Sequence, residues 1–212
     1  MRQSFVGSGI LKIPSLQQTE ALLEEAKVLN PGIWINHSIY VAKAAKLISE
    51  RCPDMDETVA YILGLLHDIG RRSGEPGMRH VLDGYLFLLE KGFADAARIC
   101  MTHTFAYQDI RAIYGEWNCS DDELTIIDNY LNKVHYDDYD LLIQLCDSLA
   151  LPFGFSLLEK RFVETALKYG TNNFTVRKWK SVIELKNYFE GRIGCSIYGL
   201  LPKIIENTFG EW

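Results

Sequence analysis

The spacing of apolar residues along the chain predicts a succession of amphipathic helices. Between Leu16 and Leu29 the apolar positions recur at helical intervals, Ser15 precedes them as a candidate cap, and a Pro-Gly pair follows. The same periodicity predicts further helices over residues 31–49, 56–68, 80–90, 94–105, 124–131, 137–147, 156–168, 174–189 and 196–209. The pattern is therefore typical of an all-α protein, a compact helical bundle in a single domain.

Two segments between the predicted helices are irregular. Residues 70–77 contain three glycines and Pro76, so the backbone of this loop can approach a ligand closely. Residues 106–120 carry Tyr107, Tyr114 and Trp117. These aromatic side chains either line a pocket and stack on a planar ligand, or simply pack on the core beneath a surface loop.

Composition narrows the class of protein. A chain of 212 residues with 48% hydrophobic and 24% charged residues suits one soluble globular domain. Its five scattered cysteines form no Cys-x-x-Cys pair, which argues against a disulfide framework or a thiolate zinc site. The net charge of −6, without a long basic run, does not indicate a nucleic-acid surface. With no membrane-length apolar run and no secretion signal, we expect a cytoplasmic protein that does not associate with membranes.

Polar residues interrupt the predicted apolar faces at several points. The helix over 56–68 is apolar nearly all round, which predicts a central position, yet it ends in His67 and Asp68. A buried aspartate without a partner is costly, and a metal ion would supply that partner. His37 lies in the first turns of the helix over 31–49, and Asp147 lies deep in an apolar run. Alone, His37 would more often be a satisfied core residue, whereas a carboxylate as deep as that of Asp147 needs a partner; together they suggest metal ligands.

Two further histidines lie between the His-Asp pair and Asp147. His80 begins a predicted helix and is followed four residues later by Gly84, whose presence inside a helix indicates close helix packing. His103 ends the helix over 94–105. We read His135, in a polar connector, as a surface residue outside the site.

The order of a histidine, a His-Asp pair, two histidines and a distant aspartate resembles the HD-domain superfamily of metal-dependent phosphohydrolases, in its two-metal branch. The resemblance covers roughly residues 30–155. It implies an HD-type helical core over 31–155, preceded by a lead-in and helix over 1–30 and followed by C-terminal helices over 156–212 packed on the core. His103 is followed by Thr104 and no Gly-Tyr-Pro signature follows the His-Asp pair, which argues against the cyclic-dinucleotide phosphodiesterases of that branch.

The same resemblance implies a ligand set and a chemistry. One ion would take His37, His67, Asp68 and Asp147, and a second would take His80, His103 and Asp68, which bridges the two. Four imidazoles and two carboxylates suit divalent Fe, Mn, Zn, Co or Ni rather than Ca. The implied activity is hydrolysis of a phosphate ester or anhydride by a metal-bridged hydroxide, in a nucleotide or another small phosphorylated metabolite.

Two arginines follow Asp68 in the glycine-rich loop. Arg71 and Arg72 are candidate catalytic residues beside Asp68, because a guanidinium matches phosphate oxygens with two parallel hydrogen bonds. The competing interpretation for each is a solvated loop arginine.

Two other functions fit the same six ligands. One is a mixed-valence di-iron oxygenase of the same fold, and the other is a metal-stabilised binding module without turnover. A complete ligand set argues against the module, since a degenerate module would be expected to lose ligands. The C-terminal helices have no ligand-type cluster, so we expect them to cover the bundle, shape the substrate pocket or form a homodimer contact.

Overall fold

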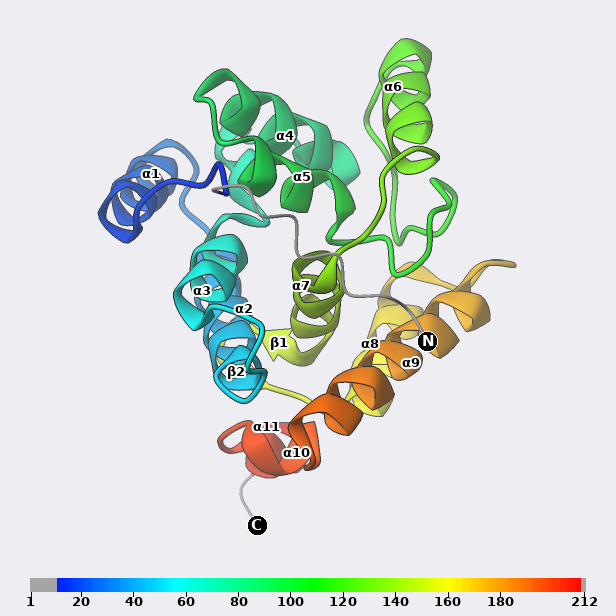
Figure 1. Cartoon of the computed structure of the whole chain (residues 1–212). Helices are drawn as coiled ribbons and strands as arrows, with labels where there is room; N and C mark the ends of the chain where they lie inside the picture. Colours follow the sequence, from blue (N-terminus) through cyan, green and yellow to red (C-terminus); the bar gives the residue numbers. More distant parts are fainter. Residues whose placement is uncertain (1–10, 211–212) are drawn as a thin grey trace.

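The computed structural model describes residues 11–210, and this range is almost entirely helical (Figure 1). Its elements are α1 (Leu16–Leu29), α2 (Ile33–Ser49), α3 (Glu57–Leu66), the 3₁₀ helices η1 (Ile69–Ser73) and η2 (Gly77–Arg79), α4 (His80–Glu90), α5 (Ala94–Thr102), α6 (Asp121–Leu131), α7 (Asp138–Leu149), β1 (Ala150–Leu151), β2 (Gly154–Phe155), α8 (Leu158–Tyr169), α9 (Thr175–Ile193), α10 (Ile197–Leu200) and α11 (Ile204–Phe209). The predicted all-α bundle is confirmed.

Helix α3 occupies the centre of the bundle, as its uniformly apolar sequence predicts. Six of its residues are buried, and it packs against α2, α5 and α7. Close contact with α2 requires Gly64, because a Cβ atom there would lie 2.5 Å from Cα of Ala42. The end of α3, where His67 and Asp68 follow, therefore lies deep inside the protein.

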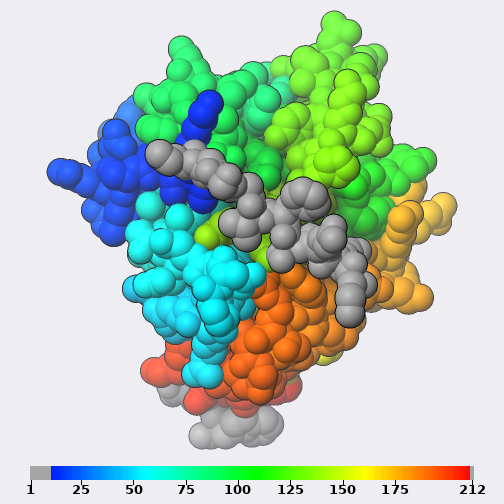
Figure 2. Space-filling model, in the orientation of Figure 1, coloured from blue at the N-terminus to red at the C-terminus, as the bar shows by residue number. Residues whose placement is uncertain are grey.

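Different sets of helices pack on the two sides of this core. Helices α4, α5 and α6 share a smaller apolar cluster of Val81, Leu82, Met101, Phe105, Ile127 and Leu131. On the other side α8 and α9 pack against α7 (Figure 1). Figure 2 shows α9 beside the turn that precedes α3, and Arg192 of α9 pairs there with Asp54 and with Asp138.

Most predicted helices are present within a few residues of their expected limits. Ser15 caps α1, and α6, which Ser120 caps, begins at Asp121, three residues before the expected Leu124. Three details were wrong. Part of the expected loop over 70–77 is the 3₁₀ helix η1, the segment 196–209 forms two helices, and the β1–β2 hairpin was not foreseen.

Some expectations are not tested by this fold. The boundaries of the predicted HD-type core, after residue 30 and after residue 155, stay predictions. Residues 1–10 of the predicted N-terminal lead-in and residues 211–212 of the C-terminal part lie outside the described range. Between residues 11 and 210, no helix combines the length and apolarity needed to cross a bilayer.

Candidate metal centre

The six predicted ligands come together at the centre of the bundle. They are delivered by separate elements: His37 by α2, His67 and Asp68 by the end of α3, His80 by the start of α4, His103 by the end of α5, and Asp147 by α7. The histidine rings form a chain, with centroids 5.3 Å apart for His37 and His67, 5.0 Å for His67 and His103, and 5.5 Å for His80 and His103.

The side chains form two groups that share one carboxylate. His37, His67 and Asp68 make the first group, and Asp68, His80 and His103 make the second; within each group the candidate ligand atoms all lie within 4.8 Å of one another. Oδ1 of Asp68 lies 3.1 Å from Nε2 of His80 and 3.6 Å from Nε2 of His103. Oδ2 of the same carboxylate lies 3.8 Å from Nε2 of His67. Asp68 thus lies between the two groups.

Asp147 adds a second carboxylate on the side of the first group. Its Oδ1 atom lies 2.9 Å from Nε2 of His37 and 3.8 Å from Nε2 of His67. The side chain of Asp147 is 28% exposed whereas that of Asp68 is 4% exposed, so Asp147 stands at the open edge of the centre.

Backbone hydrogen bonds orient three of the four imidazoles. Nδ1 of His67 donates to the carbonyl of Gly64 (2.8 Å), Nδ1 of His80 to Gly77 (2.9 Å), and Nδ1 of His103 to Cys100 (2.9 Å). Because a carbonyl only accepts, Nδ1 carries a proton, which leaves Nε2 as the nitrogen that each ring turns toward the centre. This arrangement is typical of metal-ligating histidines.

The backbone approaches unusually closely where these elements meet. A Cβ atom on Gly70 would lie 2.0 Å from the carbonyl oxygen of His80 and 2.4 Å from the amide nitrogen of Gly84. A Cβ atom on Gly84 would in turn lie 3.0 Å from Sγ of Cys100. The close packing predicted from Gly84 is confirmed, and it holds the segments bearing Asp68, His80 and His103 together.

The protonation states of the centre suit a cation. Burial lowers the pKa of His67, and burial with the neighbouring His67 lowers the pKa of His103 to about 3. Burial alone would raise the pKa of Asp68, but Arg71, His80 and His67 hold it well below its ordinary value. Burial is likewise outweighed at Asp147, where His37 and the other imidazoles lower the pKa. Neutral imidazoles and ionised carboxylates are the forms that bind metal ions.

Two buried atoms of the centre have no hydrogen-bond partner among the described residues. They are Nε2 of His67 and Oδ1 of Asp68. Leaving such groups unpaired in the interior costs about 1–3 kcal/mol each. A divalent ion would satisfy both atoms, so the residues fit the metal that their types suggest.

Arg71 lies directly against this centre. Its Nε atom donates to Oδ2 of Asp68 at 2.7 Å, and one terminal nitrogen lies 3.3 Å from Nε2 of His80. The guanidinium therefore contacts two of the three residues of the second group. The sequence identified Arg71 as a candidate phosphate contact, but not its contacts with two candidate ligands.

Arg72 points elsewhere. It pairs with Glu25 of α1, and its guanidinium lies over the ring of Phe87, 4.1 Å from the centroid. Arg72 does not line the cavity beside the metal centre. Its position therefore offers no support for the predicted contact with phosphate.

A cavity of about 810 Å³ opens beside the six residues. It is bounded by the 70–79 segment, the aromatic loop and the C-terminal helices, as expected for a substrate pocket. Tyr114 lines the cavity, whereas Trp117 stacks on Phe105 with centroids 5.9 Å apart. Tyr114 therefore lines a pocket and Trp117 packs on the core, whereas stacking on a planar ligand stays a prediction.

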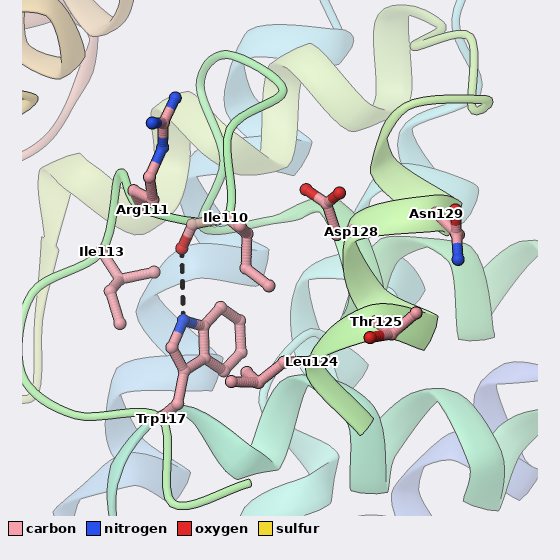
Figure 3. A pocket seen from close by; sticks show the side chains of 8 residues that line it. All are labelled: Ile110, Arg111, Ile113, Trp117, Leu124, Thr125, Asp128 and Asn129. Atoms are coloured by element: carbon pink, nitrogen blue, oxygen red, sulfur yellow. Dashed lines mark hydrogen bonds between the residues drawn. The ribbon is translucent and has the colours of Figure 1, made fainter. Parts of the chain in front are cut away.

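The cavity also includes Lys178 and Arg161, which the sequence did not reveal. Isolated basic residues on amphipathic helices resemble solvent-exposed positions, so no local pattern identified them. A second hollow of about 530 Å³ lies between the aromatic loop and α6 (Figure 3). Its residues include Ile113, Trp117 and Leu124, with no histidine, and its Arg111 is paired with Asp109.

Fold and centre together define an α-helical protein with a buried histidine–aspartate cluster suited to divalent ions. The family model described as HD domain matches residues 34–151, more than half of the 212 residues, and the chain belongs to this family. HD domains bind divalent metals, and most are metal-dependent phosphohydrolases. Comparisons of the sequence with curated proteins and with solved structures gave no match.

Proposed function

We propose that this protein is a two-metal phosphohydrolase, acting on a phosphate ester or anhydride of a nucleotide or another small phosphorylated metabolite. The main support is the position of Asp68, whose two oxygens face opposite groups of histidines. A carboxylate placed in this way is suited to bridging two ions. The open cavity beside it is large enough for a small metabolite.

The proposed ligands fall into two sets, one for each of the two groups that share Asp68. His37, His67, Asp68 and Asp147 would hold one ion. Asp68, His80 and His103 would hold the other. When bound, the ions would activate a water molecule and polarise the phosphoryl group for displacement.

The protein's own residues would bind and orient the substrate. A guanidinium has five N–H donors, and Arg71 uses two of them toward Asp68 and His80. Its remaining donors are available to phosphoryl oxygens at the edge of the cavity. Arg71 would thereby offset negative charge that develops in the transition state. The oxygenase and the binding module have no observation of this kind in their favour, so we do not propose them.

The test is the metal content of protein purified without chelators, together with turnover of a panel of phosphate compounds. We expect about two transition-metal ions per chain. Asp68→Ala should lose the ions and turnover while the helical circular dichroism persists. His135→Ala is the matched control, because His135 is exposed and outside the centre. A metal-free, inactive wild type after ions are added back, or a fully active Asp68→Ala variant, would refute the proposal.

A further inference from the structure

One side of the cavity carries basic residues that the HD-domain match does not account for. Arg161 of α8 and Lys178 of α9 line the same cavity as His37, Asp68 and Asp147. Both lie beyond residues 34–151, the part of the chain that matches the family. We call these two side chains the basic wall.

Lys178 is only partly satisfied by the protein. Its ammonium donates to the carbonyl of Ala112 at 3.0 Å and lies 4.7 Å from the ring centroid of Tyr114. An ammonium has three donors, so two remain for the cavity. Burial lowers the pKa of Lys178 to about 8, although the charge of Asp147 acts in the opposite direction. A nearby anion would stabilise this cation.

Arg161 completes the wall from the neighbouring helix. Burial raises the pKa of Tyr114, and the charge of Arg161 opposes this rise, so both cations lie near the same aromatic residue. Over residues 11–210, no carboxylate comes within 4.0 Å of the charged nitrogens of Arg161 or Lys178. By contrast Arg71, Arg72, Arg79, Arg98, Arg111 and Arg192 all form ion pairs.

Aromatic contacts fix the wall in place. The rings of Phe162 and Trp179 stack with centroids 5.3 Å apart and an interplanar angle of 4°, which holds α8 against α9. The indole nitrogen of Trp179 donates to the hydroxyl of Tyr114 at 2.6 Å. Each cation is therefore the chain neighbour of a ring in this stack, since Phe162 follows Arg161 and Trp179 follows Lys178.

The acidic residues of the cavity do not cancel this charge. Asp68 and Asp147 belong to the metal centre. Glu164 pairs with Lys160 at 3.5 Å, and over residues 11–210 neither Glu164 nor Glu75 lies within 4.0 Å of the charged nitrogens of Arg161 or Lys178. The wall is therefore a cationic surface in the same cavity as the metal centre, where we propose that the phosphoryl group of the substrate binds.

We propose that Arg161 and Lys178 bind a second phosphate group of the substrate, separate from the phosphoryl group at the metal centre. The inference rests on the proposed function and narrows it to compounds that carry two phosphate groups. The cavity, at about 810 Å³, has room for both groups and the part of the molecule between them.

The first experiment measures binding without turnover. Inorganic phosphate is titrated into chelator-treated, metal-free protein by calorimetry at low salt, for wild type, Lys178→Met and Arg161→Gln. Lys180→Met is the matched control, because Lys180 is exposed on α9 and does not line the cavity. Loss of a charge-assisted contact should weaken phosphate binding about tenfold in the two wall variants and leave the control unchanged.

The second experiment measures selectivity in the Mn²⁺-loaded protein. Values of kcat/KM are compared for 4-nitrophenyl phosphate, which carries one phosphate, and for a nucleoside 3′,5′-bisphosphate. The wall variants should lose about tenfold on the bisphosphate and retain the monophosphate value within about twofold.

The outcomes separate this inference from the proposed function. Unchanged phosphate binding in both wall variants, an equal loss in Lys180→Met, or an equal loss on both substrates would overturn the second phosphate site. A wild type that binds phosphate through the wall but turns over no compound of the phosphate panel would overturn the hydrolase and leave the site standing. Arg161→Lys should restore much of the affinity, because it restores the charge.

Discussion

The Nε atom of Arg71 donates to Oδ2 of Asp68 across 2.7 Å, within a single turn of chain. The same guanidinium reaches His80, so a permanent cation lies against the group of residues that we assign to the second metal ion. Two cations this close repel each other strongly in a poorly solvated interior. Under the proposed function, Arg71 would therefore have two opposing effects: it would weaken binding of the second ion and assist binding of the substrate.

Replacing Arg71 with Met should separate these effects. We expect tighter binding of the second ion, because the competing guanidinium is gone, and a turnover about a hundredfold lower, because charge on the phosphoryl group is no longer offset. Metal titration by calorimetry and steady-state kinetics measure the two changes. Arg72→Met is the control: Arg72 pairs with Glu25, so its loss should leave both quantities nearly unchanged. Unaltered turnover in Arg71→Met would contradict the proposed role.

Single-ligand variants should remove the ions one at a time. His103→Ala eliminates a residue of the second group only, so elemental analysis should find about one ion per chain instead of two. His37→Ala should also leave about one ion, held by the second group. Asp68→Ala should leave none, because both groups share this carboxylate. Equal losses in the two histidine variants and in Asp68→Ala would indicate a single ion.

Replacing Gly70 with Ala should destabilise the protein severely. The new methyl group would lie 2.0 Å from the carbonyl oxygen of His80, and the backbone there cannot move without displacing α4. We expect the free energy of unfolding to fall by about 3 kcal/mol or more. Gly191→Ala provides the contrast: it lies within α9 with nothing within 4 Å of the added atom, and should stabilise by up to about 1 kcal/mol. Urea denaturation measures both.

Asp140 should make stability depend on pH. Burial raises the pKa of Asp140 to about 7, whereas an aspartate in an unfolded chain has a pKa of about 3.9. Between these values the folded state keeps a proton that the unfolded state releases, so stability falls as pH rises from about 4 to about 7. The hydroxyl of Thr102 donates to this carboxyl group at 2.7 Å. Asp140→Asn keeps that acceptor and should flatten the fall of Tm over this window; an identical pH profile in the two proteins would be the contrary result.

The sequence predicted the helices well, and it singled out six polar side chains that lie together in the fold, because both depend on local patterns. Apolar periodicity identified α1 and α4 to the residue, and His67 with Asp68 interrupts an apolar run too abruptly to be packing alone. Whether each of the six ligands binds an ion stays a prediction. Their convergence in space is what the structure adds.

What the sequence did not reveal depends on contacts between distant segments. Arg71 and Arg72 are adjacent and chemically identical, yet one contacts Asp68 and the other contacts α1. The path of the backbone through η1 determines which of the two side chains points to Asp68 and which points to α1. Lys178 was overlooked for a similar reason, since a lysine on an amphipathic helix is normally solvated, and here Ala112 and Tyr114 from another segment enclose it.

His37 and Asp147 touch although 110 residues separate them along the chain. On the ribosome the first of these residues emerges well before the second, and the centre stays incomplete until α7 has been made. Early uptake of an ion by the half-finished chain would lack one carboxylate and its hydrogen-bonded imidazole. The complete centre can therefore load only after α7 has been made and has packed against α2 and α3.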